Sequence, residues 1–276
     1  MSLWLQSCGR RARCDTMASI MTASGRIGFE EAGGGPATPI IFLHGVGSDK
    51  SVWQAQLAHF GKIRRSVAFD YPGYGESELL ADATRDDFAK AILAAMDRLD
   101  IAKAHVCGLS LGGVVALAMH HAAPDRCSSL IIADSFAVHP DGQAIHDRSV
   151  AASRAMTMGE LANARAGLLL GSQATPELRG EIIATMGRIN PAAYRLGAAA
   201  VWLANQCDRA RAVDVPTLIL VGVEDMITPP ALSQDLQAMI AQSQLVEIVG
   251  AGHLANVEQS ARFNGAIESF FASLGN

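Results

Sequence analysis

The chain has 276 residues, of which 50% are hydrophobic and 18% charged, and its formal net charge is −5 at pH 7. This length suffices for one large α/β domain with a substantial core, or for two small ones. The net charge is negative, so the chain lacks the excess of Lys and Arg that is typical of nucleic-acid-binding proteins. No apolar run approaches the roughly 18 residues that a membrane helix requires. The expected partner is therefore a neutral or mildly anionic small molecule, and neither nucleic acid nor a membrane.

Residues 1–22 are expected to form a poorly ordered extension. In this segment a very short apolar stretch comes first and the arginines follow it. A secretory signal has the opposite order, with basic residues first and then about 7–15 apolar residues, so no secretory signal is expected here. The five cysteines, spread from Cys8 to Cys207, are odd in number and show no zinc-site spacing. They predict a reducing, cytoplasmic location without a disulfide framework or a metal site, and we expect no cofactor.

From residue 26 onward, short apolar runs alternate with stretches of helical period. A weak extended piece over residues 26–32 is expected to supply the first, antiparallel edge of a sheet. Strands are predicted over residues 39–45, 65–73, 104–109, 129–134, 217–222 and 245–249, and helices over residues 84–99, 110–122, 231–240 and 256–273. Thr84, with Asp87 three residues later, is the expected N-cap of the first of these helices. The alternation is typical of an α/β protein with a mostly parallel sheet covered on both faces.

The stretch from residue 136 to residue 212 breaks this alternation. It has no strand-like run, it is rich in Ala, Met, Gly and Arg, and Pro176 and Pro191 interrupt it. We expect several short helices there, inserted into a core made of residues 23–135 and 213–276. An insertion after a strand end is well placed to cover a ligand crevice at the carboxyl edge of the sheet. Helices that merely pack on the sheet would have the same pattern.

Residues 108–112, G-L-S-L-G, match the G-x-S-x-G nucleophile elbow and lie between a predicted strand and a predicted helix. In such an elbow the serine adopts a strained backbone conformation and neighbouring segments approach closely, so Gly108 and Gly112 must lack side chains. The hydroxyl then projects at the sheet edge beside the N–H groups of the helix amino end. The pattern predicts Ser110 as a nucleophile, although a chain rich in small residues also produces this pentapeptide by chance.

A serine nucleophile needs a base, and the base needs an acid that orients it. In this arrangement the order along the chain is nucleophile, acid, histidine. Asp225 and His253 each follow a predicted strand, so both reach the same edge of a parallel sheet as Ser110. We predict Ser110, Asp225 and His253 as the catalytic residues, with Asp134, which also follows a strand, as the alternative acid.

Hydrolysis of an acyl group further requires donors for the oxyanion. The N–H of Leu111, directly after the nucleophile, is one expected donor, and the N–H of Val46, in the loop after the strand over residues 39–45, is the other. Gly45 and Gly47 allow that backbone to bend toward a ligand. Asp70, in the turn-rich segment that follows the next strand, is expected to brace the structure.

Candidate pocket residues are fewer and less specific. The substrate pocket is assigned to His44, Gly45, Trp202 and Leu254, although His44 fits the role of a loop brace better. Apolar residues of the insertion are candidates for an acyl pocket or for the core: Met156, Met158, Met186 and residues 168–170. Four arginines are candidates to bind a carboxylate or to lie solvated on the surface: Arg148, Arg154, Arg188 and Arg195.

Five motifs together resemble the α/β-hydrolase family. They are H-G at 44–45, D-x-P-G-x-G-x-S at 70–77, G-L-S-L-G-G at 108–113, G-x-x-D-x-x-x-P at 222–229 and G-H at 252–253. The resemblance covers residue 26 to the C-terminus. It implies an eight-stranded, mostly parallel sheet with flanking helices and a helical cap, residues 136–212, inserted after the sixth strand.

Within that family, the elbow and the histidine loop, G-A-G-H-L-A-N-V-E-Q at 250–259, are similar to those of 3-oxoadipate enol-lactonases and small carboxylesterases. The resemblance implies hydrolysis of an ester or lactone through an acyl-enzyme. Ser110 excludes the branches that use an aspartate nucleophile. The C–C bond hydrolases are an alternative, but they carry Asn and Trp where this chain has Leu109 and Leu254.

A second alternative is a non-catalytic ligand receptor on the same scaffold, although no member of the predicted Ser-His-Asp set has been lost. A third alternative is perhydrolysis or halide oxidation as a side activity of the same residues. The sequence leaves open the physiological substrate, the preference for acyl length or lactones, and the oligomeric state, a homodimer included.

Overall fold

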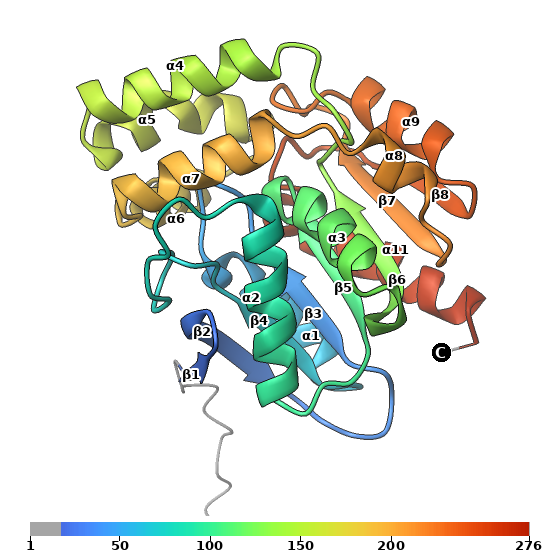
Figure 1. The fold of residues 1–276 in the computed structure, drawn as a ribbon. Helices are drawn as coiled ribbons and strands as arrows, with labels where there is room; N and C mark the ends of the chain where they lie inside the picture. Colours follow the sequence, from blue (N-terminus) through green and yellow to red (C-terminus); the bar gives the residue numbers. More distant parts are fainter. Residues whose placement is uncertain (1–17, 276) are drawn as a thin grey trace, which may run out of the picture.

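The computed structural model describes residues 18–275, which form one eight-stranded sheet with helices on both faces (Figure 1). The strand order is β1-β2-β4-β3-β5-β6-β7-β8. The strands are β1 (Ala18–Thr22), β2 (Gly25–Ala32), β3 (Ile40–Leu43), β4 (Ser66–Phe69), β5 (Ala104–Leu109), β6 (Cys127–Ala133), β7 (Thr217–Gly222) and β8 (Ser243–Ile248). β2 pairs antiparallel with both β1 and β4, and every other pair is parallel. The predicted fold class is confirmed.

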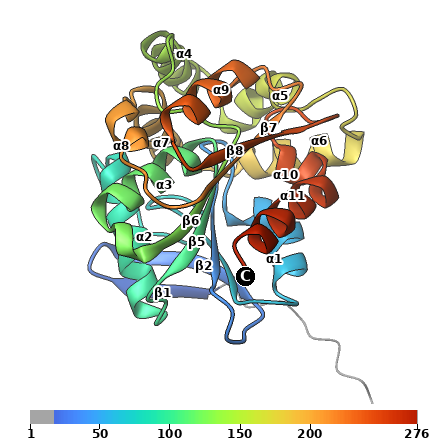
Figure 2. The same ribbon diagram turned by 90° about the vertical axis from the view of Figure 1, so that its right-hand side faces the viewer.

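The helices of the core cover the two faces of the sheet, with α2 and α3 on one side and α1 and α11 on the other (Figure 2). The helices are α1 (Gln54–Phe60), α2 (Arg85–Arg98), α3 (Leu111–Ala122), α4 (Gly142–Ala155), α5 (Met158–Leu169), α6 (Pro176–Gly187), α7 (Pro191–Trp202), α8 (Cys207–Arg211), α9 (Pro230–Met239), α10 (Ala255–Glu258) and α11 (Ser260–Ser273). Two short 3₁₀ helices, η1 (Lys50–Trp53) and η2 (Pro124–Arg126), connect them.

Local sequence explains most of these elements. Every residue of β3, β4, β5 and β7 is buried, as parallel strands covered on both faces must be. The predicted cap of α2 is confirmed, because the Thr84 hydroxyl accepts from the Asp87 N–H and the Asp87 carboxylate accepts from the Thr84 N–H. Periodicity and capping therefore position the sheet and the helices that cover it.

The N-terminal edge differs from the prediction. Within the expected extension 1–22, residues 18–22 form β1, which pairs with β2, so the edge strand is β1 and the segment over 26–32 is second in the sheet. The segment A-S-I-M-T alternates half-buried and exposed residues, the pattern of a strand with one face in solvent. Residues 1–17 lie outside the described part of the chain.

The C-terminal helix also differs. The predicted helix over residues 256–273 is divided into α10 and α11, because Gln259 leaves the helical conformation with φ −130° and ψ 50°. A single periodic stretch of sequence does not reveal such a break.

The segment between β6 and β7 contains α4 to α8, inside the stretch 136–212 for which inserted helices were expected. Helices α4 to α7 lie together beyond the end of the sheet where β6 finishes (Figure 1). We call this segment the helical insertion; that it acts as a cap stays a prediction.

Three cysteines of the described chain, Cys107, Cys127 and Cys207, are free thiols. Cys8 and Cys14 precede the described residues, and the predicted cytoplasmic location stays a prediction. Between residues 18 and 275, no helix combines the length and hydrophobicity that crossing a bilayer demands.

Candidate active site

Ser110 occupies a sharp turn between β5 and α3. Its φ of 55° and ψ of −112° lie where a residue with a side chain is strained. The turn is held by the Ser110 N–H, which donates to the Ala133 carbonyl at 2.9 Å, and by the Ser135 hydroxyl, which donates to the Ser110 carbonyl at 2.7 Å. The strained elbow predicted at this position is present.

The glycines on both sides of the serine are required by close backbone contacts. A Cβ atom at Gly108 would lie 2.1 Å from the Gly112 carbonyl oxygen, and a Cβ atom at Gly112 would lie 2.1 Å from the Leu43 carbonyl oxygen. Both distances are far inside van der Waals contact. The close approach that we expected at Gly108 and Gly112 is therefore confirmed.

His253 and Asp225 contact each other at the ends of β8 and β7. The His253 Nδ1 lies 2.8 Å from Asp225 Oδ2, which also accepts the Thr228 hydroxyl at 2.7 Å. Asp225 Oδ1 accepts the N–H groups of Ile227 at 2.7 Å and Thr228 at 2.9 Å. Burial alone would raise the pKa of Asp225, but the neighbouring His253 and the Thr228 hydrogen bonds outweigh it and lower the pKa. Asp225 is thus held ionised against the imidazole.

Asp134, the alternative acid, lies close by without contacting His253. Its Oδ1 accepts the Gly222 N–H at 2.8 Å, and its Oδ2 has no partner within residues 18–275. Burial, and secondarily the charge of Asp225, raises the pKa of Asp134 well above its ordinary value. Of the two candidate acids, the one hydrogen-bonded to His253 is Asp225.

Ser110 and His253 line one small cavity, which we call the Ser110 cavity. Its walls come from the loops after β3, β5, β7 and β8 and from the helical insertion. The cavity measures about 30 Å³. Because one water molecule needs about 10–15 Å³, the free space of the cavity is only a few times that of a water molecule. Within the described chain, the Ser110 hydroxyl and His253 Nε2 form no hydrogen bond with each other, although they face the same space.

Two backbone donors adjoin this cavity. Among the hydrogen bonds of residues 18–275, none uses the N–H of Val46 or of Leu111. Val46 lines the cavity, and Leu111 is the first residue of α3, directly after Ser110. Both N–H groups are therefore available to a ligand atom, as an oxyanion site requires.

Three of the four expected pocket residues, Gly45, Trp202 and Leu254, line the Ser110 cavity. The assignment of His44 to the pocket was wrong. The His44 ring is buried between Tyr71 and Tyr74, its Nδ1 lies 2.8 Å from the Gly45 carbonyl, and burial lowers its pKa to about 4. His44 braces the loop after β3.

Asp70 also has a bracing role. It is fully buried, and its carboxylate accepts the Lys50 N–H at 2.8 Å and the Lys50 ammonium at 2.7 Å. Burial raises the pKa of Asp70 to about 7, although Lys50 opposes the shift. The contacts fix η1 against the turn-rich segment after β4.

The apolar candidates from the insertion fall into three groups. Met186 and Leu169 line the Ser110 cavity, whereas Met158 is packed in the core and Leu170, half-buried, packs against that core. Met156 and Leu168 are each 44% exposed. Helical spacing alone did not separate these roles.

Of the two roles left open for the four candidate arginines, exposure on the surface fits Arg148, Arg154 and Arg188, whereas Arg195 is half-buried. None of Arg148, Arg154, Arg188 and Arg195 lines the Ser110 cavity, whereas Arg165 of α5 does. The sequence did carry a signal for Arg165, because it interrupts the apolar stripe of its helix, four residues after Leu161 and four before Leu169.

Two glutamates join the loops of Asp225 and His253 to the insertion, a role that the sequence did not reveal. Glu258 accepts the N–H of Gly252 at 3.0 Å and the N–H of Gly171 at 2.6 Å. Glu224 accepts the Ser172 N–H at 2.7 Å. The only feature of the sequence that pointed to Glu258 was its position, five residues after His253. Segment 171–172, between α5 and α6, is thus fastened to both loops.

No set of three or more His, Cys, Asp and Glu side chains in the described residues is placed to hold a metal ion. The expectation of a site without metal or cofactor stays a prediction.

The Alpha/beta hydrolase family matches residues 40–266. This chain belongs to that family. Its relatives include 3-oxoadipate enol-lactonase 1 of Acinetobacter baylyi, which is 27% identical over 240 residues, 86% of this chain and 90% of that protein. The 2-hydroxymuconate semialdehyde hydrolase of Pseudomonas sp. strain CF600 is 28% identical over 271 residues, 92% of this chain and 93% of that one.

Solved structures of α/β hydrolases are also similar. A thermophilic esterase from Thermogutta terrifontis is 28% identical and has a TM-score of 0.86, with 95% of this chain and 100% of that one covered. The predicted resemblance to enol-lactonases and esterases of this family is confirmed.

Proposed function

We propose that this α/β hydrolase cleaves a carboxylic ester or lactone with Ser110 as nucleophile, His253 as general base and Asp225 as the orienting acid. The observation that carries the proposal is the 2.8 Å contact of His253 Nδ1 with an ionised Asp225, in the cavity that the strained Ser110 also lines. A carboxylate on Nδ1 fixes the proton there and leaves Nε2 free to accept the proton of the serine.

In the proposed reaction, His253 takes the Ser110 proton as the serine oxygen attacks the carbonyl carbon. The oxyanion accepts hydrogen bonds from the N–H groups of Val46 and Leu111. Collapse breaks the carbon–oxygen bond, and His253 gives its proton to the leaving alkoxide. Water, deprotonated by His253, then attacks the acyl-enzyme and releases the acid and free Ser110. In a lactone the leaving hydroxyl stays attached to the acyl chain.

The helical insertion acts in this proposal as a cap that admits the substrate. A cavity of about 30 Å³ is far smaller than an ester, so side chains or helices over it must move. Ser48 and Met186 line the cavity, whereas Asp49 and Arg188, one and two residues further on, line a larger groove. We propose that substrates enter from this groove past Met186, and that the Ser110–His253 hydrogen bond forms in the occupied site.

The kinship supports this reaction class, since an enol-lactonase and an esterase are among the similar proteins. A second candidate is hydrolysis of a carbon–carbon bond, favoured by the likeness to 2-hydroxymuconate semialdehyde hydrolase. Leu109 and Leu254 stand where those hydrolases were expected to carry Asn and Trp, which favours the ester or lactone.

Stopped-flow assay with p-nitrophenyl esters of rising chain length, beside lactones and a ring-cleavage product, tests the proposal. We expect a burst of p-nitrophenol, and loss of turnover in Ser110→Ala. A fluorophosphonate must label Ser110 and not Ser48, the other serine of the same cavity. An unchanged rate in Ser110→Ala would reject the mechanism. Absence of label on folded wild-type protein would favour a binding protein, and turnover confined to the ring-cleavage product would favour the second candidate.

A further inference from the structure

The backbone around His253 is held by two acceptors, one from α10 and one from the helical insertion. Three consecutive N–H groups, those of residues 252–254, each donate a hydrogen bond. Glu258 Oε1 accepts the Gly252 N–H at 3.0 Å and the Leu254 N–H at 3.3 Å. The Leu169 carbonyl accepts the His253 N–H at 3.0 Å. One carboxylate and one carbonyl therefore fix the chain on both sides of the histidine.

The other oxygen of the same carboxylate binds the insertion. Glu258 Oε2 accepts the Gly171 N–H at 2.6 Å. Leu169 is the last residue of α5 and Gly171 follows two residues later, so both contacts come from the end of one helix. An ionised carboxylate accepts on both oxygens at once, and hydrogen bonds to a charged group are the stronger kind. A single side chain thus joins the His253 loop to the insertion.

Glu258 does not act as a surface ion pair. It is half-buried, and it forms no ion pair with a lysine or arginine of residues 18–275. Burial raises the pKa of the Glu258 carboxyl, although the N–H groups of Gly171, Gly252 and Leu254 favour its ionised form. The groups that this carboxylate serves are therefore the backbone donors of the two segments.

The two backbones are in direct contact beside Glu258. A Cβ atom at Gly171 would lie 2.8 Å from the Gly252 nitrogen, and a Cβ atom at Gly252 would lie 2.6 Å from the Gly171 nitrogen. Neither position has room for a side chain. Because segments packed this closely transmit a displacement, a shift of the insertion at this junction would move the His253 loop as well.

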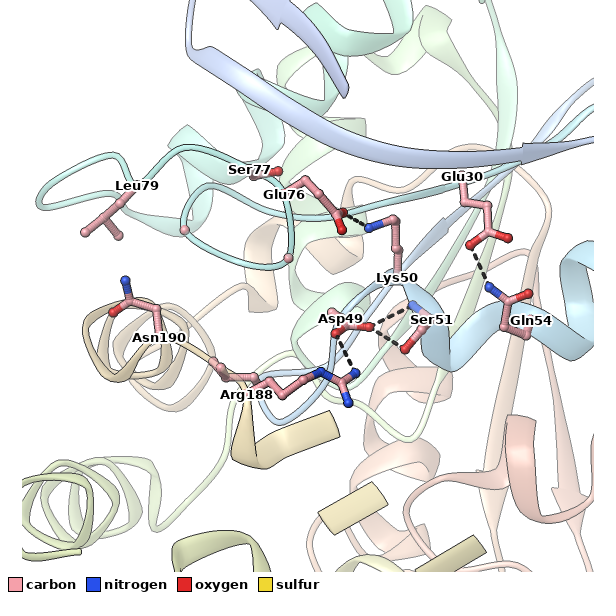
Figure 3. Close-up of a pocket in the computed structure, with 13 residues that line it drawn as sticks. Glu30, Asp49, Lys50, Ser51, Gln54, Glu76, Ser77, Leu79, Arg188 and Asn190 are labelled. Atoms are coloured by element: carbon pink, nitrogen blue, oxygen red, sulfur yellow. Dashed lines mark hydrogen bonds and ion pairs between the residues drawn. The ribbon is translucent and has the colours of Figure 1, made fainter. Parts of the chain in front are cut away.

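The insertion has a weaker attachment where it borders the larger groove, of about 800 Å³. There Arg188, which follows α6, pairs with Asp49 at 3.7 Å, and the Arg188 side chain is 62% exposed (Figure 3). Exposed pairs of this kind contribute little to stability. Opening the insertion at the groove is therefore easier than displacing it at Glu258.

We propose that Glu258 is a positioning residue, which holds His253 against Asp225 and Ser110 while the insertion opens at the groove. This inference rests on the proposed function. Glu258 touches neither the substrate nor the reacting atoms in this proposal, and it acts through the N–H groups on either side of His253. Accurate placement of the base matters, because a displacement of about 1 Å can cost about a hundredfold in rate.

Glu258→Gln tests the role. The amide has one oxygen, so it cannot accept from both Gly171 and Gly252, and its NH₂ group would face an N–H donor. We expect kcat for p-nitrophenyl acetate to fall about ten- to a hundredfold. KM should stay close to the wild-type value, because the walls of the Ser110 cavity are unchanged. The rate at which a fluorophosphonate labels Ser110 should fall by a similar factor.

Glu224→Gln is the matched control. It makes the same chemical change on a carboxylate that binds the same segment of the insertion, through the Ser172 N–H at 2.7 Å, and that accepts no bond from residues 252–254. Its kcat should stay close to that of wild type. Equal kcat values in the two variants, or a fall in kcat no larger than the fall in folded fraction measured in urea, would overturn the assignment.

Glu258→Asp provides the test if the glutamine variant does not fold. Aspartate keeps the charge but is shorter by one methylene group, so it cannot span Gly171 and Gly252 together. We expect its kcat to lie between those of wild type and Glu258→Gln, again with KM unchanged. A kcat equal to that of wild type would reject the need for the double contact.

Failure of the proposed function would give a different result, because wild type and Ser110→Ala would then hydrolyse the ester equally slowly. NMR tests Glu258 in that case without turnover. A proton on His253 Nδ1, which lies 2.8 Å from Asp225 Oδ2, should give a downfield resonance in wild type. This resonance should broaden or vanish in Glu258→Gln and persist in Glu224→Gln. An unchanged resonance in Glu258→Gln would reject the positioning role.

Discussion

Asp225→Asn is the substitution whose effect the contacts of the site define best. The amide oxygen can keep the two backbone bonds from Ile227 and Thr228. The NH₂ group then replaces Oδ2, which accepts both the His253 ring and the Thr228 hydroxyl. An amide nitrogen cannot accept either bond. The ring is then expected to place its proton on Nε2, where it blocks transfer from Ser110.

The size of the effect follows from the two bonds lost. A hydrogen bond to a charged group contributes about 1.5–3 kcal/mol, so two contribute about 3–6 kcal/mol to keeping the reactive tautomer. At about 1.4 kcal/mol for each factor of ten, kcat should fall by about 10² to 10⁴. Steady-state hydrolysis of p-nitrophenyl acetate measures this directly, and unfolding in urea checks that the variant is folded.

Asp134→Asn is the matched control, since it makes the same chemical change at the same sheet edge on a residue that does not contact His253. Asparagine also tolerates the φ of 47° at this position. We expect its kcat to stay close to that of wild type. The reasoning is refuted if Asp225→Asn keeps kcat within tenfold of wild type, or if Asp134→Asn loses as much.

Three other predictions follow from the same contacts. Burial, together with the charge of Asp225, raises the pKa of Asp134, so above about pH 4 the folded protein binds more protons than the unfolded chain. The free energy of unfolding should therefore fall as the pH rises through that range. Urea titrations at several pH values should show a smaller fall in Asp134→Asn than in wild type. Gly112→Ala places a Cβ atom 2.1 Å from the Leu43 carbonyl; the elbow must move by about 1 Å, and kcat of protein that still folds should drop about a hundredfold. Met186→Ala should raise the rate ratio of p-nitrophenyl octanoate to acetate about tenfold, and an unchanged ratio would reject entry past Met186.

The sequence by itself determined the order of the core elements and the position of the elbow. Fully apolar runs such as those of β5 and β7 must be covered on both faces, and a parallel sheet brings every strand end to one edge. That rule alone placed Asp225 and His253 on the side of Ser110. These signals are local, because they depend on side chains a few residues apart.

Only the tertiary structure decided which candidates meet. Asp134 and Asp225 both follow strands, and the packing of β6, β7 and β8 places the His253 imidazole in hydrogen-bond contact with Asp225 and not with Asp134. The tertiary structure also packs His44 against Tyr71, outside the pocket. It places Arg165 in the cavity, although the sequence had suggested four other arginines as candidates. Such choices depend on distances between segments far apart in the chain, which a periodic pattern within one segment does not fix.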